Sequence, residues 1–124
     1  MRAVVSLAGP VDSLELRRAG IEHLHLPVPM MLLDSERARR RFLEVMPLVL
    51  DFVQRSLQQK KPVMIHCYHG CDRTGTALAC CLVAFYGLTA QEAVQRVRAA
   101  NPAAMEVVGY AEAVETFANL LTDK

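Results

Sequence analysis

Short apolar runs and longer amphipathic stretches alternate along this chain, a pattern that favours an α/β fold. The β-branched run at residues 3–7, which Gly9-Pro10 terminates, predicts a first strand. Residues 21–28 alternate in polarity and end among prolines, which predicts a second strand with one face buried. Residues 62–66 predict a third, central strand that is buried on both faces over residues 63–65.

Two amphipathic segments precede the third strand. Residues 13–18 can form a short helix that stops at Gly20. A long helix is predicted after an N-cap at Asp34 or Ser35, with apolar residues at helical spacing. Pro47 lies inside this helix and predicts a bend or break near residues 44–46, because proline removes a helical hydrogen bond.

Three more helices are predicted after the third strand, at residues 74–86, 90–100 and 105–121. Thr89 and Glu92 have the spacing of a capping box, and Asn101-Pro102 separates the last two helices. The predicted fold class is α/β, with a small central, mostly parallel sheet flanked by helices. We expect residues 1–124 to form a single domain.

Composition and charge exclude several kinds of partner. A formal net charge of +1 over 124 residues creates no global field that attracts nucleic acid or an acidic membrane. The apolar run at the start is too short for a signal peptide, and no stretch approaches the ~20 residues that span a bilayer. Four cysteines without secretory features indicate free thiols. We therefore expect a cytoplasmic protein without nucleic-acid or membrane partners.

The candidate chemistry lies between the third strand and the next helix, where residues 66–75 read HCYHGCDRTG. Five residues separate Cys67 from Arg73, and such a loop can aim several backbone N–H groups at one anion. The positive end of the following helix favours a thiolate at Cys67, and Arg73 offers paired donors to phosphate oxygens. The segment predicts a nucleophile, Cys67, under a phosphate-binding loop of Tyr68, His69, Gly70, Cys71, Asp72 and Arg73.

The string HCxxGxxRTG resembles the signature loop of cysteine-based protein tyrosine phosphatases, specifically the small dual-specificity branch. The fuller form HCxHGxDRTG is similar to compact bacterial members. Residues 4–7, residues 19–29 and the helices after Thr74 also stand in the usual order of that family. Such domains commonly have another strand or two before the first strand seen here. The resemblance implies a phosphomonoester hydrolase with a phosphocysteine intermediate, and we expect it to need no metal or cofactor.

The leaving oxygen needs a proton donor in such a reaction. The resemblance implies an aspartate on a loop upstream of the cysteine, and Asp34 lies 33 positions ahead of Cys67. Many animal members instead place this aspartate directly after a proline, where this chain has Met30. Asp34 could alternatively be a helix N-cap. Asp72 is a competing acid, for which we favour a structural role.

Two further residues receive supporting roles. We expect the Thr74 hydroxyl to hydrogen-bond the Cys67 sulfur when it departs as a thiolate. The resemblance implies that His66 fixes the cysteine backbone rather than acting as a base. The expected substrate is a phosphorylated protein or a small phosphomonoester, and phosphate or sulfate should occupy the loop.

Other functions remain open at this point. RNA 5′-triphosphatases share the form HCxHGxxRTG, so a polyphosphate end is a possible substrate, whereas the lack of lysine in the loop disfavours phosphoinositides. A non-catalytic module that binds phosphorylated ligands, a rhodanese-type sulfur transferase, and a metal centre of His66, Cys67, His69 and Cys71 are the alternatives from other classes.

Further histidines, cysteines and arginines, inside and outside this segment, could also have functional roles. We expect His23 and His25 to be partly exposed strand residues rather than a metal-binding pair. A reversible oxidative link between Cys67 and Cys71 is a hypothesis, whereas Cys80 and Cys81 are expected in the core. The arginines at positions 37, 39, 40 and 41 could steer anionic substrates or form a solvated helix face.

Overall fold

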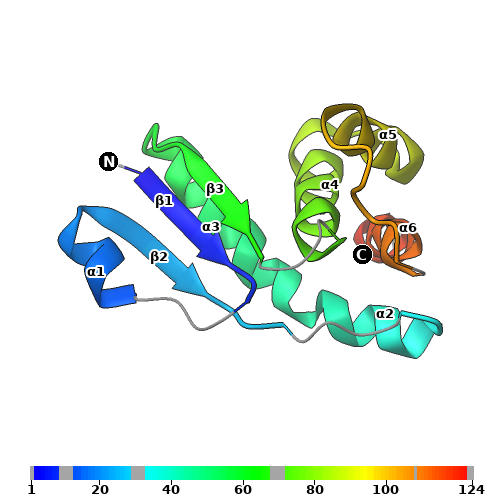
Figure 1. The fold of residues 1–124 in the computed structure, drawn as a ribbon. Coiled ribbons are helices and arrows are strands. Elements are labelled where there is room, and N and C mark those ends of the chain that lie inside the picture. The colour runs from blue at the N-terminus through cyan, green and yellow to red at the C-terminus, as the bar shows by residue number, and fades with distance from the viewer. Residues whose placement is uncertain (1, 9–12, 29–32, 68–71, 108, 123–124) are drawn as a thin grey trace.

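A computed structural model describes residues 2–8, 13–28, 33–67, 72–107 and 109–122. The elements are β1 (Arg2–Ser6), α1 (Ser13–Arg18), β2 (Ile21–His25), α2 (Glu36–Phe42), the 3-10 helix η1 (Leu43–Val45), α3 (Met46–Gln58), β3 (Val63–His66), α4 (Asp72–Tyr86), α5 (Ala90–Ala100) and α6 (Tyr110–Thr122). Figure 1 shows α4, α5 and α6 together on the side toward which the strands point. The predicted α/β class with a small parallel sheet is confirmed.

The described strands form one parallel sheet in the order β2-β1-β3. The prediction of a central third strand was therefore wrong for the described sheet, where β1 lies between the other two. Residues 63–65 are also not buried on both faces, because Met64 is 58% exposed while its neighbours on either side are partly buried. An apolar run alone does not reveal whether one or two strands will flank it. In the described sheet β3 has a single neighbour, β1, and part of its side-chain surface remains exposed to solvent.

Backbone hydrogen bonds continue past the ends of the strands. β2 ends at His25, earlier than predicted, yet the N–H groups of Leu26 and Val28 still donate to Ser6 and Leu7, each at 2.9 Å. The N–H of Leu7 donates to the carbonyl of His66 at 2.9 Å. These bonds hold the residues at and just after the carboxyl ends of all three strands side by side. Open α/β sheets bind their ligands at this end of the strands.

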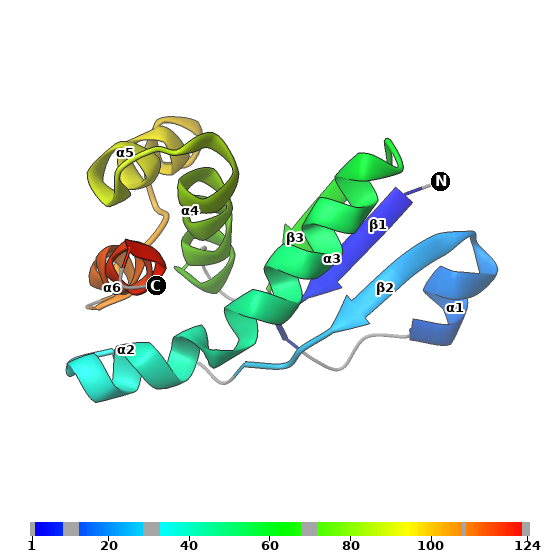
Figure 2. The same ribbon diagram turned by 180° about the vertical axis from the view of Figure 1, so that it is seen from behind.

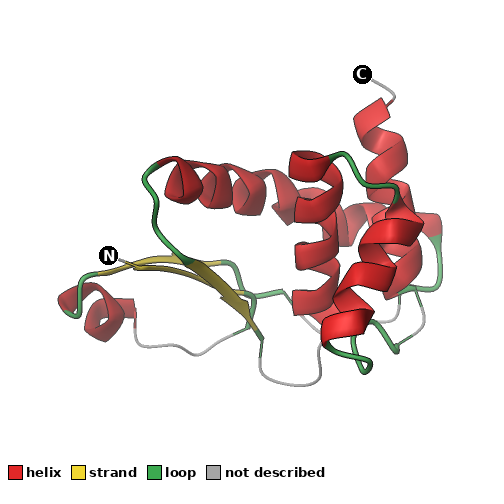
Figure 3. Cartoon of the chain, turned by 90° about the horizontal axis from the view of Figure 1, so that it is seen from above, coloured by secondary structure: helices red, strands yellow, loops and turns green. Residues whose placement is uncertain are grey.

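The long predicted helix is divided as Pro47 suggested. α2 ends at Phe42, and η1 at residues 43–45 overlaps the break expected near residues 44–46. Pro47 lies in the first turn of α3, where a missing N–H costs nothing. Figure 2, from behind, shows α3 lying across one face of the sheet. Figure 3 shows α1 at the end of the sheet opposite α4, α5 and α6.

The last three helices differ from prediction mainly at their starts. α4 begins at Asp72, two residues early, and the predicted capping box of α5 is present at Thr89 and Glu92. α6 begins at Tyr110 rather than at residue 105, because Met105 and Gly109 have φ values of 59° and 97°, which a right-handed helix excludes.

α6 packs against α2 through apolar side chains. Tyr110 of α6 is fully buried and its ring meets that of Phe42 edge-on, with centroids 5.5 Å apart. Met46, Val49 and Val114 are fully buried in the same core. Within the described residues, no helix combines the length and the apolar character needed to cross a membrane.

Candidate active site

Cys67 follows the last residue of β3 and is partly buried. The hydroxyl of Thr74, in the first turn of α4, donates to the Cys67 sulfur at 3.0 Å. A hydroxyl donor stabilises negative charge on sulfur, both in a thiolate nucleophile and in a departing thiolate. The structure thus brings together the two residues that the sequence assigned to the nucleophile and its hydrogen-bond donor.

The loop residues Tyr68, His69, Gly70 and Cys71 lie outside the described residues, as does any contact between Cys71 and Cys67. The described structure resumes at Asp72, where α4 starts. Because α4 begins directly after this segment, the positive end of its dipole adjoins the predicted phosphate-binding loop.

Arg73 is buried, with only 6% of its surface exposed. Its Nη1 donates to the carbonyl of Val28 at 2.5 Å, on the segment that follows β2. Its Nε is buried and has no hydrogen-bond partner within the described part of the chain. A buried guanidinium with an unused donor is costly unless an anion faces it, so this residue suits a phosphate site better than a structural role.

Asp72 is also buried, at 4% exposure, and its carboxylate serves the scaffold of the site. Oδ1 accepts a hydrogen bond from the N–H of Val107 at 3.2 Å, and the Asp72 carbonyl accepts one from Thr76 Oγ1 at 2.7 Å. The bond from Val107 ties the start of α4 to the turn after α5, whereas the bond from Thr76 lies within the first turns of α4. They give Asp72 contacts suited to the structural role we favoured over that of an acid.

The turn that binds Asp72 is held by a residue that sequence reasoning missed. Arg98 donates from Nε to the Ala104 carbonyl at 3.1 Å and from Nη2 to the Met105 carbonyl at 2.9 Å. Gly75 lets this turn approach α4, because a Cβ there would stand 3.1 Å from Cβ of Ala104. Nothing in the sequence marks Arg98, since it looks like an ordinary basic residue near a helix end.

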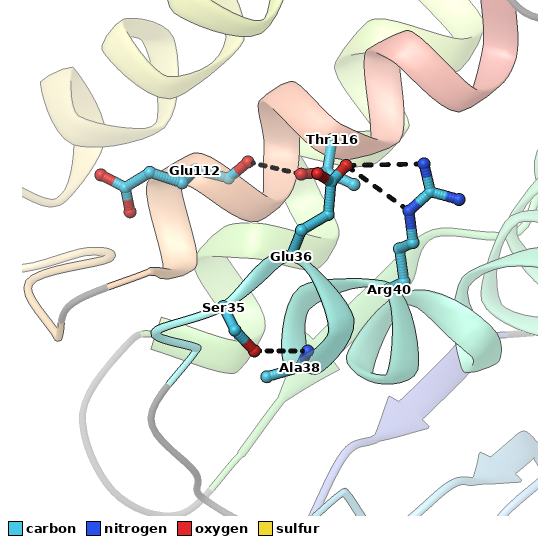
Figure 4. A network of polar contacts seen from close by, with 6 residues as sticks. All are labelled: Ser35, Glu36, Ala38, Arg40, Glu112 and Thr116. Atoms are coloured by element: carbon cyan, nitrogen blue, oxygen red, sulfur yellow. Dashed lines mark hydrogen bonds and ion pairs between the residues drawn. The ribbon is translucent and has the colours of Figure 1, made fainter.

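Asp34 is exposed and directly precedes the N-cap of α2. Ser35 is the cap, since its side chain accepts the Ala38 N–H at 3.1 Å, as Figure 4 shows. The alternative that Asp34 itself caps the helix is therefore wrong. Its carboxylate is left available for chemistry at the start of α2.

The position of Asp34 is fixed through its neighbour Leu33, which is fully buried. The Leu33 carbonyl accepts a hydrogen bond from Arg39 Nη1 at 3.0 Å. Gly109, just before α6, packs so closely that a Cβ there would stand 1.9 Å from the Leu33 oxygen. The adjoining helix α2 and the distant turn before α6 thus clamp the segment that carries the proposed acid.

The arginines of α2 have different roles. Arg39 binds Leu33, and Arg40 pairs with Glu36 on an exposed face, as Figure 4 shows. Arg37 and Arg41 line a hollow of about 530 Å³ together with Val28, whose carbonyl binds Arg73. Glu44 also lines this hollow, but the two arginines outnumber it and give net positive charge beside the segment that holds the buried guanidinium.

His66 belongs to a hydrogen-bonded set that the sequence did not reveal. Its Nε2 lies 2.6 Å from Ser6 Oγ, which lies 2.8 Å from His23 Nε2, and His23 Nδ1 lies 2.8 Å from Ser13 Oγ. We call these four residues the histidine–serine network. The prediction of a partly exposed His23 was wrong, because α1 and β1 cover it to 7% exposure, whereas His25 is exposed.

Cys80 and Cys81 are buried in α4 as free thiols. Burial raises the pKa of the Cys81 thiol to about 11, and burial together with Cys81 raises that of Cys80 further, so both are inert core residues as expected. The described ranges contain no cluster of three or more histidine, cysteine, aspartate or glutamate side chains that could hold a metal. His69 and Cys71 of the alternative metal centre lie outside those ranges.

Comparison with known proteins agrees with this geometry. The family described as "Polymorphic toxin system, DSP-PTPase phosphatase" matches residues 1–87. The tyrosine-protein phosphatase cdc-14 of Caenorhabditis elegans is 30% identical over 91 residues, which cover 73% of this chain and 11% of that protein. The protein tyrosine phosphatase domain-containing protein 1 of Bos taurus is 38% identical over 76 residues, or 59% of this chain and 9% of that protein. The chain thus spans a small part of these curated relatives.

Among solved structures, the active form of Tk-PTP superposes with a TM-score of 0.78 at 30% sequence identity. The match covers 95% of this chain and 78% of that one. The family match spans the strands, the segment with Asp34, and the whole of the loop and α4. This chain therefore belongs to the DSP-PTPase phosphatase family.

Proposed function

We propose that this chain hydrolyses phosphomonoesters through a phosphocysteine at Cys67, as a protein tyrosine or dual-specificity phosphatase. The observation that carries the proposal is the hydrogen bond from the Thr74 hydroxyl to the Cys67 sulfur. Thr74 directly follows the buried Arg73 in the sequence. An inert structural thiol needs neither a polar donor at its sulfur nor a buried guanidinium nearby in the chain. Membership of the family supports the same conclusion.

The first step is attack of the Cys67 thiolate on phosphorus. The loop N–H groups and Arg73 hold the phosphoryl oxygens and stabilise the charge that develops on them. A sulfur–phosphorus bond forms while the bond to the ester oxygen breaks. Asp34 gives its proton to that oxygen, so that a neutral alcohol or phenol leaves.

The second step is hydrolysis of the phosphocysteine. Asp34, now ionised, takes a proton from a water molecule that attacks phosphorus. The sulfur–phosphorus bond breaks and phosphate leaves the loop. Thr74 donates to the sulfur throughout, which makes the thiolate a better leaving group.

Turnover of p-nitrophenyl phosphate tests the proposal. We expect hydrolysis by the wild type and none above background by Cys67→Ser, because a serine hydroxyl does not ionise at neutral pH. Cys81→Ala is the matched control, since it removes a buried thiol away from the loop and should keep full turnover. Tight binding of phosphate without any turnover would instead favour the non-catalytic binding module.

The substrate class can be separated by direct comparison. We expect phosphotyrosine peptides to be hydrolysed, with peptides that carry phosphothreonine as the test of dual specificity. The hollow lined by Arg37 and Arg41 supports substrates with acidic residues near the phosphate. RNA with a 5′-triphosphate end and a phosphoinositide are the competing substrates, and a thiosulfate-to-cyanide assay tests sulfur transfer.

The proposed chemistry also bears on where the protein works. A thiolate nucleophile must remain reduced in order to attack phosphorus. We therefore propose that the enzyme acts in the cytoplasm, which fractionation of cells that express it would test.

A further inference from the structure

The histidine–serine network connects β2 to the residue before Cys67. Ser6 is fully buried in β1 and lies between His23 of β2 and His66 of β3. Ser13 at the start of α1 completes the network on the far side of His23. The mechanism above uses none of Ser6, His23 and Ser13, although a buried polar set of this kind is retained only when its hydrogen bonds are satisfied.

Ser6 has a single hydroxyl proton, so it cannot donate to both histidines at once. Ser6 can donate to one histidine Nε2, and it must then accept from an N–H at the Nε2 of the other. If neither Nε2 carried a proton, one of the two short contacts would lack a hydrogen. If both carried one, the Ser6 proton would have no acceptor among these two rings. Both contacts hold a hydrogen and the Ser6 proton has an acceptor within the network when one of His23 and His66 is protonated at Nε2 and the other is not.

The surroundings of His23 oppose its acquiring a positive charge. Burial lowers the pKa of His23, and the charges of His25, Arg17 and His66 act in the same direction. His25 stacks on His23 from the same strand, with ring centroids 5.7 Å apart. Arg17 of α1 and Glu22 of β2 line a hollow beside it, to which α3 contributes only the uncharged Phe52. His23 is thus harder to protonate than a histidine in water.

We propose that His23 is a positioning residue, which through Ser6 determines the ring nitrogen of His66 that carries the proton next to Cys67. The proposal rests on the proposed function, because it assigns His66 a place beside the nucleophile. When His23 takes up a proton at low pH, its Nε2–H must donate to Ser6, and Ser6 must then donate to His66 Nε2. The hydrogen bonds then all run from His23 through Ser6 to His66, and Nε2 of His66 is held as an acceptor.

The wild-type protein alone can test the arrangement. Long-range ¹⁵N–¹H spectra of the imidazole rings report the protonated nitrogen of each of the four histidines. We expect one of His23 and His66 to carry its proton on Nε2 and the other on Nδ1 at neutral pH. The same tautomer at both rings would overturn the proposal. Because this result needs no turnover, it is independent of whether the proposed function holds.

Variants test whether the arrangement matters to the reaction. His23→Leu removes both ring nitrogens, and we expect kcat/KM for p-nitrophenyl phosphate to fall about tenfold, the factor that one hydrogen bond represents. The acid limb of its pH profile should move, and the His66 tautomer should change. His23→Gln retains a donor and an acceptor for Ser6 without titrating, so it should recover most of the activity lost in His23→Leu.

His25→Leu is the matched control, because it removes the exposed histidine of the same strand. It should keep the wild-type His66 tautomer, and its pH profile should lie closer to that of the wild type than to that of His23→Leu, because it removes only one of the causes that lower the pKa of His23. A purely structural His23 would lower stability in His23→Leu but leave both of these readouts unchanged, and that outcome would overturn the proposal. If His23→Leu does not fold, His23→Gln and the wild-type spectra still decide the question.

Discussion

In the proposed mechanism, Thr74 acts through one hydrogen bond, which its hydroxyl donates to the sulfur of Cys67. Thr74→Val keeps the side-chain shape and removes the donor. We expect kcat to fall about tenfold, with phosphocysteine breakdown becoming slower than its formation, because the thiolate leaves without a partner. Rapid-quench kinetics would show this as a burst of p-nitrophenol.

The control for that variant is Thr116→Val. The hydroxyl of Thr116 donates to the Glu112 carbonyl within α6, remote in sequence from the loop (Figure 4). This variant should retain wild-type kcat. Equal kcat values and no burst in Thr74→Val would contradict the role of its hydroxyl.

The carboxylates of Asp34 and Asp72 have opposite predicted roles. Asp34→Asn removes the proton donor, so we expect kcat for a phosphate ester of a poorly acidic alcohol to fall by roughly 10² to 10⁴. The loss should be smaller with p-nitrophenyl phosphate, whose leaving group needs little protonation. Steady-state kinetics on both esters measures the difference.

Two aspartate variants serve as comparisons. Asp51→Asn removes an exposed carboxylate that pairs only with Arg55 on α3 in the described structure, and it should leave kcat unchanged. Asp72→Asn should lower stability, because it weakens the bond to Val107. Our assignment of the acid fails if only Asp72→Asn shows the large, ester-dependent loss.

At the scale of elements, the clamp between Leu33 and the turn before α6 positions Asp34. Gly109→Ala forces a Cβ against the Leu33 carbonyl and imposes a φ of 97° on a residue with a side chain. We expect a loss of about 1–3 kcal/mol of stability from backbone strain, increased by this collision, together with reduced kcat. Urea unfolding and p-nitrophenyl phosphate kinetics measure the two effects.

Gly87→Ala separates the collision from the strain. Gly87 also has a positive φ, of 68°, but a Cβ there meets no atom within 4 Å. This variant should lose stability through strain alone and keep its kcat. Equal behaviour of the two variants would show that the contact with Leu33 does not hold the acid.

The elements of this chain were largely predictable from local patterns. Helical spacing, the Thr89–Glu92 capping box and Pro47 located most helices, because these signals lie within a few residues of one another. The start of α6 was missed, since the turn before it depends on Arg98, a residue of the preceding helix. The central place of β1 and the exposure of Met64 depend on strand order, which no local pattern contains.

In the candidate site, too, residues close together in the sequence were easier to predict than residues far apart. The sequence could assign Cys67, Arg73 and Thr74 to one candidate site because they are close in sequence and their residue types suit one reaction. Asp34 was selected by resemblance, and the structure adds the clamp that holds its segment. The network of His66, Ser6 and His23 was not predictable, because its partners are 60 and 17 positions apart and meet only through the sheet register.

At the scale of the whole molecule, the buried His23 links stability to pH. Its folded-state pKa is lowered from 6.5, so the unfolded chain binds the proton more readily. Stability from this residue is therefore present above about pH 6.5 and is lost as the pH falls below that value. The free energy of unfolding, measured with urea at several pH values between about 5 and 8, should decline toward acid.

His23→Gln should show a flatter decline than the wild type, because glutamine does not titrate. His25→Gln, at the exposed neighbour, should show a slope closer to the wild type, because burial, the main cause of the lowered His23 pKa, remains. The role of His23 in acid sensitivity would be refuted by equal slopes in wild type and His23→Gln.

The three described strands of the parallel sheet end together next to the start of α4, where the sequence predicts the phosphate-binding loop. Leu7 binds the carbonyl of His66, Val28 binds that of Leu7, and Arg73 donates to that of Val28, so all three strand ends support the start of α4. The central claim is that phosphate is transferred at this edge to the sulfur of Cys67 before water releases it.

Trapping that intermediate tests the claim most directly. The enzyme is mixed with p-nitrophenyl phosphate, quenched in acid within the first turnover, digested and mapped by mass spectrometry. We predict one phosphoryl group on the peptide that contains Cys67, in the wild type and more abundantly in Thr74→Val. Hydrolysis that proceeds with no phosphorylated Cys67 in either protein, or that persists in Cys67→Ser, would contradict the account.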